Sequence, residues 1–185
     1  GSSWSQRTAW GAGQLPVEEL PEQVIERAIA SRNPCDVVPG TYPVVFAAAA
    51  FAELLSWIVG DLDARAADEG RSFMSRTDEA GKPDGNRVGE QIFSPLVQVE
   101  RNSAHPLLQS ESFFEDGLSN HYLEVIRGGT PQTLSYSRYW AQERGKAPTG
   151  AMSPIVMAGS EQSLSDLIAQ TERGILVSRA WYVRY

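Results

Sequence analysis

The longest apolar stretch of the chain, residues 44–60, constrains the possible folds more than any other segment. It is shorter than the roughly 20 residues that a membrane-spanning helix needs, and Glu53 and Ser56 interrupt it. Apolar side chains recur at helical spacing over residues 47–67, and Gly70 follows where a helix cap belongs. We therefore expect a buried helix over residues 47–67 and no membrane span. Its apolar side consists of Phe51, Leu54, Leu55, Ile58 and Leu62.

The composition is that of an acidic, soluble, globular protein. The 185 residues are 42% hydrophobic and 21% charged, which predicts one domain over residues 1–185. Acidic residues outnumber basic ones by 23 to 16, so nucleic acid is not an expected partner. Cys35 is the only cysteine, which excludes a disulfide within the chain and favours a reducing, cytoplasmic setting.

The remaining patterns predict an α+β fold with a mostly antiparallel sheet and two or three packing helices. Further helices are expected over residues 21–32 and 137–144, and from Ser163 to a stop at Gly174. Residues 76–86 are predicted to be a flexible polar loop. Strands are expected over residues 41–46, 97–99 and 154–158, and in a hairpin that pairs residues 122–127 with 133–136 through a loop longer than the tightest type.

The C-terminal segment alternates apolar and polar residues from Ile175 to the last residue. An apolar strand edge without a cap, charge or proline is a template for pairing with another chain. We therefore expect an interface there, to a second copy or to a partner, that involves Trp181, Val183 and Tyr185.

No independent catalytic or metal site emerges from the titratable residues. His105 and His121 are sixteen residues apart and lie outside the expected helices, whereas a zinc site needs about three converging ligands. Cys35 is better explained as a small apolar filler than as a nucleophile. Serines are too numerous for counting to exclude a Ser-His-acid triad, but no Gly-x-Ser-x-Gly elbow occurs. We therefore name no catalytic and no metal-binding residue.

Short segments spread over nearly the whole chain have a characteristic order. They run Asn33-Pro34, Pro39-Gly40-Thr41-Tyr42, Val44-Val45, Ala52-Glu53-Leu54-Leu55, Glu69-Gly70-Arg71-Ser72-Phe73, Gly89-Glu90-Gln91-Ile92-Phe93, Phe114-Glu115-Asp116-Gly117, Tyr136-Ser137-Arg138-Tyr139-Trp140-Ala141, Pro148-Thr149-Gly150, residues 163–168 and Glu172-Arg173-Gly174-Ile175-Leu176-Val177. In this order they resemble the TldD/PmbA family of metalloprotease-related proteins, once labelled modulators of DNA gyrase.

The resemblance implies a subunit of a TldD/TldE-type heterodimer that degrades unfolded or modified peptides in the bacterial cytoplasm. In that family only the TldD-like subunit carries the zinc motif His-Glu-x-x-x-His, on a helix that corresponds here to residues 47–67, with a later cysteine completing the site. This helix has no histidine, and Cys35 precedes it. The resemblance therefore implies a non-catalytic, TldE/PmbA-like chain that is inactive alone and holds no cofactor, with zinc in a TldD-like partner.

Two further expectations follow from the resemblance. Family members continue beyond both ends of this segment, so the chain corresponds to a middle-to-C-terminal portion without the N-terminal α/β domain and the last segment. The loop after the zinc-motif helix, Glu69, Arg71, Ser72 and Phe73, is expected to line the peptide cavity. The alternatives are an ordinary helix-ending loop with Phe73 as a core anchor and, for the whole chain, a free-standing binding or scaffold protein.

Overall fold

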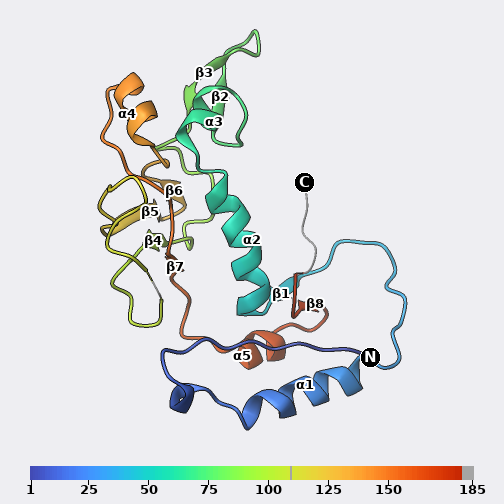
Figure 1. The fold of residues 1–185 in the computed structure, drawn as a ribbon. Coiled ribbons are helices and arrows are strands. Elements are labelled where there is room, and N and C mark those ends of the chain that lie inside the picture. The colour runs from blue at the N-terminus through green and yellow to red at the C-terminus, as the bar shows by residue number, and fades with distance from the viewer. Residues whose placement is uncertain (109, 181–185) are drawn as a thin grey trace. The chain divides into compact units, whose positions relative to one another are not determined.

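The computed structural model describes residues 1–108 and 110–180, and these form two compact units (Figure 1). Of the described residues, the terminal unit comprises 1–54 and 161–180, and the central unit comprises those within 55–160. The predicted interface residues Trp181, Val183 and Tyr185 lie outside the described residues. Within the described ranges, no helix is both long and apolar enough to cross a bilayer.

The terminal unit is built around a two-stranded parallel sheet. Its strands pair Val44 with Ile175 and Phe46 with Val177, which joins the first quarter of the sequence to its C-terminal part. Ser163 and Asp166 form the predicted capping box at the start of the last helix, with each side chain accepting a hydrogen bond from the other residue's backbone N–H. The elements of this unit are η1 (Ala12–Gln14), α1 (Glu19–Ala30), β1 (Val44–Phe46), the first half of α2 (Ala48–Gly60), α5 (Leu164–Ala169) and β8 (Ile175–Val177).

The central unit contains an antiparallel four-stranded sheet in the order β6-β5-β4-β7 and a separate β2–β3 hairpin. This arrangement confirms the predicted α+β class with mostly antiparallel pairing. The elements are the end of α2, α3 (Ala64–Asp68), β2 (Ser75–Thr77), β3 (Pro83–Asn86), β4 (Val99–Arg101), β5 (Leu123–Arg127), β6 (Thr130–Pro131), α4 (Arg138–Arg144) and β7 (Ile155–Met157). Their fully buried apolar side chains include Leu62, Met74, Val99, Val125, Ile126 and Leu134.

The helix predicted over residues 47–67 is wrong in its extent, because it divides into α2 and α3. The chain turns at Asp61 and Leu62. Asp63 is the N-cap residue of the second helix, and its own backbone is extended. Its Oδ1 accepts a hydrogen bond from the N–H of Ala66 at 2.6 Å. A carboxylate in this position satisfies a backbone donor that a new helix would otherwise leave free. The break therefore has a local cause that apolar periodicity does not reveal.

Two loop predictions are also corrected. Residues 76–86 are not one loop, because β2 and β3 pair Ser75 with Asn86 across them. The hairpin formed by β5 and β6 turns tightly through Gly128 and Gly129, both with positive φ, instead of through the longer loop expected. A Cβ atom at Gly129 would overlap the carbonyl oxygens of residues 93 and 94, so this turn requires glycine for space as well as for φ.

Among the described residues, Arg101 has the largest fully buried side chain, and its hydrogen bonds there go to carbonyl groups and not to a carboxylate. Its Nε donates to the carbonyl of His121 at 3.1 Å, and its Nη1 donates to those of Thr149 and Ala151 at 2.5 and 2.7 Å. The guanidinium lies 5.3 Å from the ring of Phe114. Burial lowers the pKa of Arg101 but leaves it charged at neutral pH. One side chain thus joins β4 to two segments distant in sequence.

We expect Arg101→Met to reduce the free energy of unfolding by at least about 2 kcal/mol, because three carbonyl oxygens lose hydrogen bonds to a charged donor. Urea denaturation monitored by circular dichroism measures this change. The matched control is Arg76→Met, since Arg76 is exposed and lies 3.8 Å from Glu90. Equal midpoints for the two variants would show that the carbonyl oxygens do not depend on Arg101.

Candidate functional site

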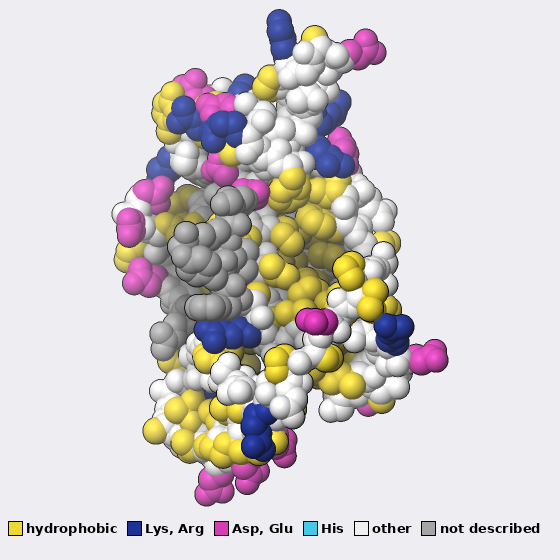
Figure 2. All heavy atoms as spheres, turned by 90° about the vertical axis from the view of Figure 1, so that its right-hand side faces the viewer, with side chains coloured by type: hydrophobic (Ala, Val, Ile, Leu, Met, Phe, Trp, Pro, Cys, Tyr) yellow, Lys and Arg dark blue, Asp and Glu magenta, His cyan; other side chains and the backbone are white. Residues whose placement is uncertain are grey.

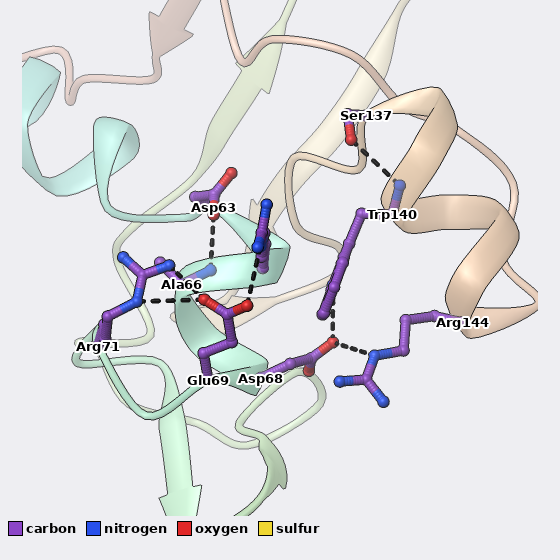
Figure 3. A network of polar contacts seen from close by, with 9 residues as sticks. Asp63, Ala66, Asp68, Glu69, Arg71, Ser137, Trp140 and Arg144 are labelled. Carbon is purple, nitrogen blue, oxygen red and sulfur yellow. Dashed lines mark hydrogen bonds and ion pairs between the residues drawn. The ribbon is translucent and has the colours of Figure 1, made fainter.

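The loop expected to line a peptide cavity begins at the C-terminal end of α3, and Figure 3 shows its charged residues. The carboxylate of Glu69 accepts a hydrogen bond from Arg65 Nε at 2.8 Å, and its second oxygen accepts two from Arg71. Because Arg65 and Arg71 are well exposed, the three residues form a surface ion-pair network. Such a network contributes little to stability but orients Arg71.

The other two residues of this loop have structural partners. Ser72 Oγ donates to the carbonyl of Asp61 at 2.7 Å and accepts from the N–H of Met74 at 3.1 Å, which closes the turn. Phe73 is 39% exposed and packs edge-on against Phe93 with the ring centres 6.1 Å apart. None of Glu69, Arg71, Ser72 and Phe73 lines the three pockets described for the central unit, and their role in peptide binding stays a prediction.

A second polar cluster, centred on Asp68 and Trp140, was not anticipated from the sequence. Asp68 accepts hydrogen bonds from Trp140 Nε1 at 3.0 Å and from Asn86 Nδ2 at 2.9 Å, and it forms an ion pair with Arg144 Nε at 3.1 Å. Figure 3 shows its contacts with Trp140 and Arg144. The guanidinium carbons of Arg65 and Arg144 lie 5.4 and 4.6 Å from the centre of the Trp140 ring. The cluster therefore joins α3 to α4 across 72 residues of sequence, a separation that no local pattern bridges.

Charged side chains of both signs are intermixed at this end of the central unit. Figure 2 shows dark blue and magenta atoms side by side at its upper end, where α3 and the β2–β3 hairpin lie. Ion pairs also join the hairpin to the segment after it. Arg76 in β2 and Arg87 after β3 each pair with a different carboxylate oxygen of Glu90. This end of the unit consequently combines cations with carboxylates and does not form a continuous basic surface.

The best-defined pocket of the central unit has a volume of about 310 Å³ and adjoins the C-terminal end of α2. The residues that line it include three serines and Asp63, together with the apolar residues Val59 and Met152. Pockets of this size hold small ligands or single residues of a peptide. The serines are Ser56 from α2, Ser135 from the segment before α4, and Ser153 from the segment before β7.

The donor groups of the chain do not fit the zinc centre that the resemblance implies for TldD-like subunits. When Glu53 is aligned with the glutamate of His-Glu-x-x-x-His, Ala52 and Trp57 occupy the two histidine positions on α2. Neither an alanine nor a tryptophan side chain coordinates zinc. Among the described residues, no three His, Cys, Asp or Glu side chains are grouped so that they could hold a metal ion.

The histidines and the cysteine occupy unrelated places. His105 Nδ1 accepts a hydrogen bond from the N–H of Leu107 at 3.2 Å, and His121 Nδ1 lies 3.2 Å from the carbonyl of Ser119. Cys35 is exposed and belongs to the terminal unit, not to the central one.

We expect the pKa of Glu69 to lie below its ordinary value, because hydrogen bonds from Arg65 and then Arg71 favour the carboxylate. The pairing therefore stabilises the fold above the unfolded-state pKa, and this contribution is lost as the pH falls through the lowered pKa. NMR titration of the Glu69 carboxyl carbon measures this pKa. Arg71→Ala should raise the pKa of Glu69, whereas Arg87→Ala should not, since Arg87 pairs with Glu90. An unchanged titration in Arg71→Ala would contradict this network.

Comparison with solved structures shows the same fold in three proteins. A Bacteroides thetaiotaomicron protein named as a modulator of DNA gyrase is 24% identical, with a TM-score of 0.75 over 90% of this chain and 36% of that chain. A Thermotoga maritima protein named likewise is 22% identical, with a TM-score of 0.77 over 92% of this chain and 40% of that chain. TldE from Thermococcus kodakarensis is 23% identical, with a TM-score of 0.74 and the same two coverages, 92% and 40%.

The chain thus spans less than half the length of these three structures. Comparison with curated proteins yields no match. Residues 39–184 match the model of the family described as the PmbA/TldA metallopeptidase C-terminal domain, which is well over half of the chain. The order of segments in the sequence, the α+β fold and this match agree, and the chain belongs to the PmbA/TldD family.

Proposed function

We propose that the chain is the C-terminal portion of a non-catalytic, TldE/PmbA-like component of a zinc metallopeptidase assembly. In this proposal a TldD-like partner holds the zinc ion and cleaves unfolded or modified peptides. The single observation that carries the proposal is the sequence of α2, which has no histidine and has Ala52 and Trp57 where the zinc motif, aligned at Glu53, would place its two histidines. A chain with this fold and without these ligands can shape a peptide cavity and bind a partner, but it cannot activate a water molecule on zinc.

The surroundings of α2 support a binding role. The helix exposes Ala52, Glu53 and Trp57, while Leu55 and Val59 are buried on another side. Its last turn forms one wall of the 310 Å³ pocket, through Ser56, Val59 and Gly60. A helix that keeps its shape and adjoins a pocket, but carries no metal ligands, is what a partner subunit of a peptidase requires.

The cellular setting belongs to the same proposal. A single exposed cysteine and an acidic composition suit the cytoplasm, where thiols stay reduced. The partner is proposed to be a TldD-like subunit, with association of two copies of this chain as the alternative. A free-standing scaffold role would instead leave the chain without any effect on a peptidase.

We expect the purified chain to contain far less than one equivalent of zinc, because its potential ligands are not grouped. Elemental analysis after purification in metal-free buffer gives the ratio of zinc to protein. About one equivalent of tightly bound zinc, lost on replacing His105 or His121, would contradict the non-catalytic assignment.

Co-expression with the TldD-like protein of the same genome tests the assembly. We expect the two chains to copurify and to cleave an unfolded peptide, whereas this chain alone should not. Glu53→Gln in this chain should leave turnover within about twofold, because without neighbouring histidines Glu53 has no metal-bound water to activate. The equivalent substitution in the partner's zinc motif should abolish turnover.

The same reconstituted complex tests the loop after α3. If this loop lines the peptide cavity, Arg71→Ala should reduce turnover, and unchanged turnover would refute that prediction. If the two chains do not copurify and turnover by the TldD-like protein is the same with and without this chain, the scaffold alternative replaces the proposed function.

A further inference from the structure

The pocket beside α2 combines one charged group with hydroxyl groups and an apolar wall. Asp63 is the only charged residue among the side chains that line it. The apolar wall includes Val59, Met152 and Ile155, and Met152 is buried. A carboxylate beside an apolar wall favours a ligand that carries a cation next to an apolar group.

Asp63 is held in place by backbone contacts on both sides. Its Oδ1 accepts from the N–H of Ala66, which leaves the second carboxylate oxygen to bind a ligand. Asp63 and Ser135 form a parallel bridge in which the N–H of Ala64 donates to the carbonyl of Ser135 at 3.1 Å. The N–H of Ser135 donates in turn to the carbonyl of Leu62 at 2.8 Å. The anionic side of the pocket is therefore fixed before any ligand arrives.

An edge strand of the four-stranded sheet adjoins the same pocket. β7 is the last strand of the sheet, and it pairs with β4 on one side. The N–H of Asn102 bonds to the carbonyl of Pro154, and that of Ala158 bonds to the carbonyl of Gln98. In an antiparallel pair this alternation turns the N–H and C=O of Ile155 and Met157 away from β4. Ile155 also lines the pocket. A peptide that is bound in the pocket and extends out of it therefore passes the N–H and C=O groups of β7.

We propose that this pocket binds the amino-terminal residue of a peptide. The α-ammonium group pairs with Asp63, the first side chain packs against Val59 and Met152, and the following backbone extends along Ile155. This inference rests on the proposed function, because it names the end of the peptide that the non-catalytic chain holds.

A peptide amino terminus fits the pocket better than a lysine side chain does. The terminal residue carries its ammonium and its first side chain on the same carbon atom, which matches a carboxylate beside apolar side chains in a pocket of about 310 Å³. A lysine side chain presents its ammonium at the end of a thin methylene stem. With that ammonium at Asp63, no apolar side chain would branch beside it toward Val59 and Met152.

Isothermal titration of the 185-residue chain with leucyl-alanyl-alanine amide tests the proposal directly. We expect measurable binding, and N-acetylation of the peptide should weaken it about tenfold or more, because a charged hydrogen bond is lost. A third probe, an N-acetylated peptide amide that contains one lysine, should bind no better than the acetylated control.

Two protein variants complete the test. Asp63→Asn removes the charge but keeps an oxygen that can cap α3, so it should weaken binding about tenfold without unfolding the chain. Its matched control is Asp61→Asn, since Asp61 lies two residues away and does not line the pocket. Gly60 lines the pocket, and a Cβ atom added there meets no atom within 4 Å, so Gly60→Leu adds apolar bulk beside the pocket without a clash and should weaken binding.

Equal affinities for the free and acetylated peptides would overturn the proposal, as would binding that Asp63→Asn and Gly60→Leu leave unchanged. Lysine-dependent binding would assign the pocket to a side chain instead. These outcomes are distinguishable from failure of the proposed function, whose readouts are copurification with a TldD-like protein and turnover. A complex that cleaves peptides while this chain alone shows no preference for a free amino terminus would refute only the present inference.

Discussion

The buried guanidinium of Arg101 is the interaction on which the central unit most depends. It binds the carbonyls of His121, Thr149 and Ala151, and therefore fixes residues 149–151 against β4. The same segment is tied to the chain before α4, because Thr149 Oγ1 donates to the carbonyl of Leu134 and Ser135 Oγ donates to that of Gly150. A buried charge costs free energy unless its hydrogen bonds are made, so these backbone positions are mutually determined.

This constraint carries directly into the pocket beside α2. Ala151 lines one side of the pocket and Ser135 another, so both walls are attached to the network around Arg101. The third wall comes from α2, which ends at Gly60. Asp63 belongs to the pocket because the helix breaks after α2 and the carboxylate caps α3. Had the helix continued, the residue would lie on a helical surface and its cap contact with Ala66 would not exist.

The family relation and the departures from it are compatible in physical terms. A fold depends on buried contacts such as those of Leu62, Val99 and Leu134, whereas a zinc centre depends on a few ligands at one helix face. The sequence of α2 contains no histidine, and its exposed positions include Ala52 and Trp57. The chain therefore retains the family's fold while its α2 carries no pair of zinc ligands.

The sequence alone determined the family, the α+β class and the positions of most elements. Local signals sufficed for α4, which Ser137 caps and Gly145 ends, and for the capping box of α5. Only the tertiary structure decided the parallel pairing of β1 with β8, the buried contacts of Arg101 and the Asp68–Trp140 cluster. The reason is physical. Helix caps are made by neighbours in sequence, so local residue preferences predict them. The other contacts join residues dozens of positions apart, and local preferences carry no information on which distant residues meet.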